Sequence, residues 1–438
     1  MNNFFIFCIA AVMIVGCSST RNIGRAAGKN LLNSGELKTA HVGISIFEPA
    51  TGKWWFNHQA EKYFIPASNV KIVTCFEAMK HLGDSLKGII YSEQENNTAI
   101  IEATGDPTLL HPAFPNQPVL EFLRTKQHIL INTQNWADDA LGAGWSWDDY
   151  NESYMTERSP MPMYGNTVRF SKAQQKIADE KLPLISYPRF FEDSLRLSED
   201  ISQLADKFAI TRDRASNKFL ILPSADSFAT IQIPFSTNNF ELTRKLLRDT
   251  LKVGVRTSYY TLPSSSILYS QPTDSVLKLM MYNSDNFLAE QLLLSISNEL
   301  LPKMNAGKLI DKLLSTDLYN LPQKPRWVDG SGFSRYNLFT PKSMVTVLNQ
   351  MRDFGMERIK NVFPSGGEGT LSGYYSMQAG SIYAKTGSMS GVVCLSGYLY
   401  TSREKELIFS VMVNNHQSTA TEVRGAIERF LQQLSSKY

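Results

Sequence analysis

Strand-like segments stand near both ends of this chain, and this arrangement limits the possible folds more than any other feature of the sequence. Residues 41–47 alternate in polarity, a Pro-Ala-Thr-Gly turn follows, and 53–57 continue as a second strand, which predicts a hairpin. Three further strand-like runs come late in the chain, at 382–385, 392–400 and 406–413, before an amphipathic helix over 421–434. Antiparallel pairing of the first and last strands would join both ends of the chain in one α/β domain.

The middle of the chain has a different pattern. Between residues 91 and 263, short strand-like segments alternate with loops and a few short helices, and no period of 20–50 residues indicates a repeat protein. We therefore predict an α/β (α+β) fold with a central antiparallel sheet flanked by helices. In this prediction 39–90 and 264–438 form one split domain, and 91–263 form a β-rich insertion.

Composition narrows the class of protein. The chain has 438 residues, of which 43% are hydrophobic, so it can bury sizeable cores and is not a disordered chain. Its 44 basic and 41 acidic residues nearly balance at +3, and no basic run marks a nucleic-acid binder. Four cysteines do not make a disulfide scaffold. Cys75 and Cys394 are predicted to be buried thiols, with a disulfide between them as the alternative.

The N-terminus predicts export. Residues 1–20 carry no charge, and the apolar run at 4–15 is shorter than the ~20 residues that a bilayer span needs. This pattern indicates a signal peptide over 1–16. Ile14-Val15-Gly16-Cys17 resembles a bacterial lipobox, which implies lipidation of Cys17, a tether over 17–38, and a periplasmic or cell-envelope lipoprotein. The basic residue that usually precedes the apolar run is missing, so an ordinary cleaved signal and a buried N-terminal strand stay open.

The first of three candidate motifs is Ser68-Asn69-Val70-Lys71. Helical periodicity over 69–82 places Ser68 at a helix N-terminus and Lys71 on the same face, three residues later. A lysine beside a serine can accept its proton only if burial or a nearby cation lowers the lysine pKa. The Ser-x-x-Lys pattern also occurs at Ser275 and Ser402, where we expect a solvated helix face and an exposed turn.

Ser284-Asp285-Asn286 is the second motif. It interrupts the helical pattern of 274–296, which would place the Ser284 hydroxyl and the Asn286 amide on a loop. Such a hydroxyl can relay a proton, and such an amide can hold a substrate backbone. The alternative role for both residues is helix capping.

The third motif, Lys385-Thr386-Gly387, occurs once and ends the strand-like run that begins at residue 382. Gly387 would let a substrate backbone approach closely. Lys385 can bind a carboxylate with help from the hydroxyls of Thr386 and Ser388. The alternative is a plain strand end with an exposed lysine.

In this order the three motifs resemble those of class A β-lactamases and penicillin-binding proteins. The long spacing between Ser68 and Ser284 is similar to that in the low-molecular-mass penicillin-binding proteins of the D-alanyl-D-alanine carboxypeptidase/endopeptidase family, class C type. Class A β-lactamases have a far shorter spacing between these two motifs. Further segments match that family over roughly residues 35–438: Gly105-Asp106-Pro107-Thr108-Leu109, the stretch 329–337 and Gly369-Thr370-Leu371.

The resemblance implies a serine-type peptidase that acts on peptidoglycan stem peptides, binds β-lactam antibiotics covalently and needs no metal or organic cofactor. It implies that Ser68 is the nucleophile, Lys71 the base and Ser284 a proton relay. It implies that substrate binding falls to Asn286, Lys385, Thr386 and Ser388. The oxyanion would lie between the backbone N–H groups of Ser68 and Ser388.

Two other functions stay open at this point: a β-lactamase or esterase with the same serine and lysine, and a catalytically inactive wall-binding lipoprotein. The preference between carboxypeptidase and endopeptidase action is open as well. The chain contains neither a His-Glu-x-x-His motif nor a phosphate-binding Gly-rich loop, which argues against a zinc peptidase or a nucleotide enzyme.

Overall fold

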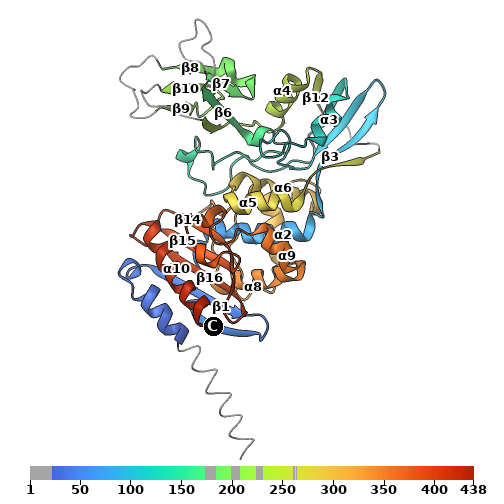
Figure 1. Cartoon of the computed structure of the whole chain (residues 1–438). Helices are drawn as coiled ribbons and strands as arrows, with labels where there is room; N and C mark the ends of the chain where they lie inside the picture. The colour runs from blue at the N-terminus through green and yellow to red at the C-terminus, as the bar shows by residue number, and fades with distance from the viewer. Residues whose placement is uncertain (1–21, 173–183, 199–207, 223–229, 260–261, 263) are drawn as a thin grey trace, which may run out of the picture. The chain divides into compact units, whose positions relative to one another are not determined.

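A computed structural model describes residues 22–172, 184–198, 208–222, 230–259, 262 and 264–438 (Figure 1). The chain forms two compact units. Unit 1 comprises Met1–Met79, Leu277–Asp285 and Ile310–Tyr438, and unit 2 comprises Lys80–Val276 and Asn286–Leu309. The predicted signal peptide and Cys17 lie outside the described residues.

Unit 1 is built on a five-stranded antiparallel sheet in the order β14-β15-β16-β1-β2. Its strands are β1 His41–Glu48, β2 Lys53–His58, β14 Ile382–Met389, β15 Val392–Tyr400 and β16 Glu406–Asn414. β1 pairs with β16, and His41 lies opposite Asn414. The predicted fold class is therefore confirmed, including the pairing of N-terminal with C-terminal strands.

Helices cover both faces of this sheet. Gly43 of β1 faces Pro341 at the start of α8, whereas its neighbour Ile44 lies in the core beneath α10, which packs along the sheet in Figure 1. Successive side chains of a strand point to opposite faces, so α8 and α10 lie on opposite sides. The helices wholly or mainly in unit 1 are α2 Val70–His81, α5 Thr273–Asn283, α7 Ala306–Ser315, α8 Pro341–Met351, α9 Met356–Val362 and α10 Ala420–Lys437, with short turns η3 Ala67–Asn69, η8 Arg352–Phe354, η9 Gly369–Leu371 and η10 Ser376–Gln378.

Residues 22–37 differ from the predicted tether. They are helical over 22–27, in η1 Gly28–Leu32 and in η2 Gly35–Leu37. Ile23, Ala27 and Leu31 recur every fourth residue, and all three are buried in the core beneath α10. The small and polar residues of this stretch suggested a tether, but this spacing of apolar residues directs it into the core of unit 1.

The described residues of unit 2 form three sheets, in the orders β12-β5-β4-β3-β13, β11-β6-β7 and β8-β10-β9. Its strands are β3 Ser85–Gln94, β4 Thr98–Ala103, β5 His128–Asn132, β6 Thr167–Lys172, β7 Leu184–Tyr187, β8 Leu195–Leu197, β9 Ala209–Arg212, β10 Phe219–Leu222, β11 Thr230–Pro234, β12 Gly254–Ser258 and β13 Ser266–Pro272. Its helical elements are α3 Pro118–Arg124, η4 Trp147–Asp149, η5 Tyr164–Asn166, η6 Arg189–Ser194, α4 Phe240–Leu251 and α6 Asn286–Leu300. The unit is rich in strands, as expected; the domain limits at 91 and 263 stay a prediction.

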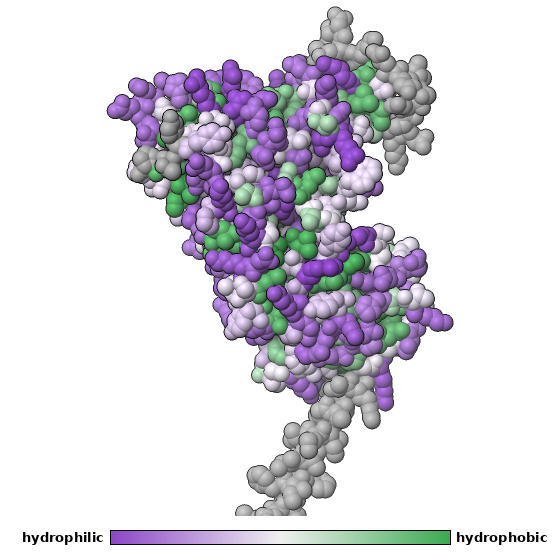
Figure 2. Space-filling view, turned by 180° about the vertical axis from the view of Figure 1, so that it is seen from behind, coloured by the Kyte–Doolittle hydropathy of each residue, from purple (hydrophilic) through white to green (hydrophobic). Residues whose placement is uncertain are grey.

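None of the helices in the described part of the chain has the length and apolar content that a membrane crossing requires. Seen from behind, the surface mixes hydrophobic residues among hydrophilic ones (Figure 2).

Candidate active site

Ser68 and Lys71 lie where the sequence predicted, at the start of a helix. Ser68 is in the short turn η3, which leads directly into α2. Lys71 is fully buried, and its Nζ donates hydrogen bonds to Ser68 Oγ at 3.2 Å and to the Ser331 carbonyl oxygen at 2.7 Å. The amine is therefore held within hydrogen-bonding distance of the hydroxyl.

The loop over 329–337 supplies that carbonyl group, and the buried Asp329 shapes the loop. Its carboxylate accepts hydrogen bonds from the Gly332 backbone N–H and the Asn337 side-chain amide, both at 2.8 Å. Gly332 has a φ of +80°, and a Cβ there would lie 1.9 Å from the Ala67 carbonyl oxygen. Only glycine lets the loop lie this close to η3, so the family-like segment is needed to position the partner of Lys71.

Lys385 and Ser284 form a second pair. Lys385 is fully buried in the middle of β14, and its Nζ donates to Ser284 Oγ at 2.9 Å and to the Thr386 carbonyl oxygen at 2.8 Å. Ser284 lies in the two-residue break between α5 and α6, with a φ of 55°. The alternative of an exposed lysine is wrong. The predicted strand end is also wrong, because 385–389 continue in unbroken register with β15.

The surroundings of Lys385 disfavour its charge. Burial, followed by the positive charges of Lys71 and Arg424, lowers the pKa of Lys385 well below its usual value of 10.5. Two amines that are buried and feel each other's charge are costly to protonate together. An anion that arrived beside Lys385 would favour the charge there, and this would leave Lys71 as the amine that is free to accept a proton.

Asn69 ties the turn that carries Ser68 to the sheet. Its amide donates to the Lys385 carbonyl oxygen at 2.8 Å, and its Oδ1 accepts from Ser396 Oγ at 2.6 Å. A Cβ on Gly387 would lie 2.6 Å from the Pro66 carbonyl oxygen. We expected Gly387 to admit a substrate backbone; in the structure it admits the backbone of this protein before η3.

Arg424 is a site residue that the sequence did not indicate. It lies on α10, and its guanidinium donates to Ser388 Oγ at 2.8 Å. Thr386 is half-buried and Ser388 is exposed on β14. The helix over 421–434 was predicted, but nothing in a lone arginine on an amphipathic helix reveals that it reaches a strand residue 36 positions earlier.

Asn286 belongs to unit 2, although Ser284 belongs to unit 1. Asn286 is the first residue of α6 rather than a loop residue, and its amide donates to the Tyr154 carbonyl oxygen at 3.0 Å. Cys75 and Cys394 are buried free thiols, as predicted.

A serine and a lysine at a helix start, with a second lysine on the adjacent strand, fit the class of serine peptidases that work through an acyl-enzyme. Comparison with known proteins identifies the group within that class. The chain belongs to the D-Ala-D-Ala carboxypeptidase 3 (S13) family, whose model matches residues 26–434. The family and the serine-type D-alanyl-D-alanine peptidase activity predicted from the sequence are thereby confirmed.

Individual relatives are distant but span most of the chain. The penicillin-sensitive carboxypeptidase A of Dictyostelium discoideum is 24% identical, with 89% of this chain and 86% of the relative covered. The D-alanyl-D-alanine carboxypeptidase of an Actinomadura species is 25% identical, with 89% and 80% covered. The crystal structure of penicillin binding protein 4 from Haemophilus influenzae matches with a TM-score of 0.70 at 18% identity, covering 94% of this chain and 98% of that chain. At this identity the structural match shows the shared fold.

Proposed function

We propose that Ser68 is the nucleophile and Lys71 the general base of a DD-peptidase reaction on peptidoglycan stem peptides. The observation that carries the proposal is the 3.2 Å contact between a fully buried Lys71 Nζ and Ser68 Oγ. Neutral Lys71 takes the Ser68 proton as Oγ attacks the carbonyl carbon between two D-alanine residues. The oxyanion lies between the backbone N–H groups of Ser68 and Ser388, which come from the adjoining segments η3 and β14.

The second half of the reaction uses the other pair. Ser284 relays a proton to the leaving amine as the peptide bond breaks, and water then hydrolyses the Ser68 ester. Lys385, Thr386 and Ser388 bind the terminal carboxylate, and Asn286 holds the acyl side. A carboxylate beside Lys385 stabilises its ammonium form, and that charge opposes a second proton on Lys71. Substrate binding therefore favours the form of Lys71 that can act as a base.

Brief exposure to penicillin tests these roles. We expect intact mass to show a lasting adduct, and peptide mapping to place it between Pro66 and Lys71. Ser68→Ala should abolish the adduct. Ser275→Ala, a change of the exposed serine in another Ser-x-x-Lys motif, should leave it unchanged.

Other results of this experiment would contradict the proposed function or the proposed nucleophile. Rapid turnover of the adduct would favour a β-lactamase or an esterase, and no adduct at all would favour an inactive wall-binding protein. An adduct that maps to Ser284 would contradict the assignment of Ser68.

We also propose that the protein is exported to the cell envelope and anchored through lipid on Cys17. The support is the lipobox-like Ile14-Val15-Gly16-Cys17 after a short apolar run. Cys17→Ser should release the protein from the membrane fraction, because the variant loses the lipid on Cys17. A single acyl chain binds a membrane only marginally, whereas several chains hold a protein firmly. Equal retention of both forms would contradict the anchor.

A further inference from the structure

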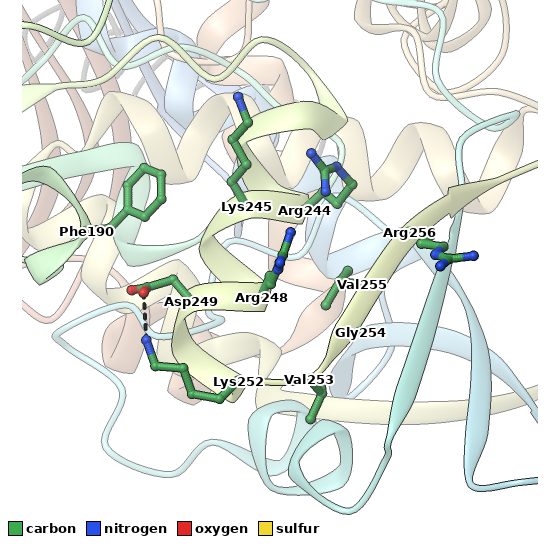
Figure 3. Close-up of a pocket in the computed structure, with 10 residues that line it drawn as sticks. All are labelled: Phe190, Arg244, Lys245, Arg248, Asp249, Lys252, Val253, Gly254, Val255 and Arg256. Atoms are coloured by element: carbon green, nitrogen blue, oxygen red, sulfur yellow. Dashed lines mark hydrogen bonds and ion pairs between the residues drawn. The ribbon is translucent and has the colours of Figure 1, made fainter.

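A basic groove in unit 2 is lined by residues that belong to none of the motifs considered above. The helix α4 and the strand β12 line it together with Phe190 of η6, and its volume is about 770 Å³ (Figure 3). This volume falls within the range of about 300–1,000 Å³ that is usual for ligand sites. The groove is lined by five cations and one carboxylate: Arg244, Lys245, Arg248, Lys252, Arg256 and Asp249. The whole chain, by contrast, carries a net charge of only +3.

The charges of the groove are only partly paired. Arg244 and Lys245 contact Glu241 at 2.8 Å and 3.3 Å, and Lys252 contacts Asp249 at 2.7 Å. Within the described part of the chain, the side chains of Arg248 and Arg256 form no hydrogen bond or ion pair, and both residues are exposed. Figure 3 shows these two arginines on separate elements, α4 and β12. Two guanidinium groups are thus free to bind a ligand.

Helix stability explains only part of this arrangement. Cations near a helix C-terminus interact favourably with its dipole, which accounts for Arg248 and for Lys252 after the last turn of α4. The argument does not extend to Arg256, which belongs to β12. A groove that gathers cations from a helix and a strand has the form of an anion-binding site.

We propose that this groove is a second binding site for polymeric peptidoglycan, which holds the carboxylates of a stem peptide that is not being cleaved. The proposal rests on the substrate class of the proposed function. Arginine binds carboxylates through two parallel N–H···O bonds, and Arg248 and Arg256 offer two such forks. Phe190 and Val253 add an apolar wall for the aliphatic part of the peptide. The groove is much larger than a single inorganic anion needs.

The test compares polymer with short substrate, using the double variant Arg248→Gln/Arg256→Gln. We expect co-sedimentation with purified insoluble peptidoglycan to weaken by tenfold or more, because two charge-assisted hydrogen-bonded contacts are lost. Hydrolysis of a short soluble peptide ending in D-Ala-D-Ala, and acylation by penicillin, should stay unchanged. The matched control is Lys303→Gln/Lys308→Gln, which removes two exposed cations of unit 2 outside the groove.

Two treatments of the peptidoglycan identify the anion that the groove binds. Amidation of the carboxyl groups of the wall should abolish the difference between wild type and double variant, whereas removal of phosphate-bearing polymers from the wall should leave it. Unchanged sedimentation, an equal loss in the control variant, or loss on removal of phosphate would each overturn the proposal. Failure of the wild type to hydrolyse the short peptide would instead count against the proposed function.

Discussion

The two units keep their cations in opposite environments. In unit 1, Lys71 and Lys385 are fully buried, and each is fixed by hydrogen bonds. In unit 2, Arg248 and Arg256 are exposed and line an open groove. A buried amine is costly unless its surroundings compensate, so its neighbours are fixed in kind and position. An exposed cation is solvated by water and places few demands on the sequence around it.

Lys71→Arg tests the buried side of this comparison and should have the largest effect. Arginine keeps the positive charge but cannot give up its proton in a protein. We expect penicillin acylation to slow by about 10²–10⁴-fold, the usual contribution of general acid–base catalysis. The thermal midpoint should move little if the guanidinium fits the site. Acylation within roughly tenfold of wild type, below that range, would mean that another group takes the proton.

Gly332→Ala tests whether the loop that contacts Lys71 depends on close packing. The new Cβ would lie 1.9 Å from the Ala67 carbonyl oxygen, and the backbone there has a φ of +80°. Strain and overpacking together should lower the free energy of unfolding by about 2–4 kcal/mol. Gly373→Ala is the control, because its φ is +83° but no atom lies within 4 Å of the new Cβ. Equal urea midpoints for the two variants would show that contact with η3 is unimportant.

Asp106→Asn tests a buried carboxyl in unit 2. Burial raises the pKa of Asp106 from 3.8 to about 6, so the folded state binds a proton more tightly than the unfolded state does. This contribution to stability is fully present below about pH 4 and is lost as pH rises through about 6. Between these pH values, the free energy of unfolding of the wild type should therefore fall by up to about 3 kcal/mol relative to that of the Asn variant, at 1.36 kcal/mol per pKa unit. Parallel urea midpoints of the two proteins across pH would contradict this.

The exposed pair should have the smallest effect on stability. Arg248→Gln/Arg256→Gln removes two exposed cations whose side chains form no hydrogen bond or ion pair with the described residues, and surface changes of this kind usually stay within about 0.5 kcal/mol. The thermal midpoint should match that of wild type, measured by circular dichroism. A clear decrease would mean that these arginines support unit 2 itself, and the contrast between the two units would then fail.

This contrast explains which parts of the molecule the sequence could predict. Ser68, Lys71, Ser284 and Lys385 were found because they belong to three short motifs whose order along the chain resembles that of a known family. The structure brings the four residues together in two hydrogen-bonded pairs. The strands of the central sheet followed from their periodicity. Arg424 was missed because its contact with Ser388 depends on how a distant helix packs, which local patterns do not encode.

Three other differences between the sequence prediction and the structure also arise from contacts made in the folded chain. Residues 22–37 contain many small and polar side chains, yet a few apolar residues at intervals of four are enough to bury the segment. The strand β14 runs past Gly387, because pairing with β15 overrides the weak strand propensity of glycine. Asn286 starts a helix in unit 2, although its separation from Ser284 along the chain is small.

The pairing of β1 with β16 also sets an order of events during synthesis. A ribosome makes β1 first, but its neighbour in the sheet is complete only when Asn414 has been added. Long-range pairing of this kind delays folding until both partners exist. Lys385, whose carbonyl group anchors the turn that carries Ser68, is likewise made long after that turn. The turn that carries Ser68 therefore leaves the ribosome before Lys385 is made, and the pair of Lys385 with Ser284 forms only in the nearly finished protein.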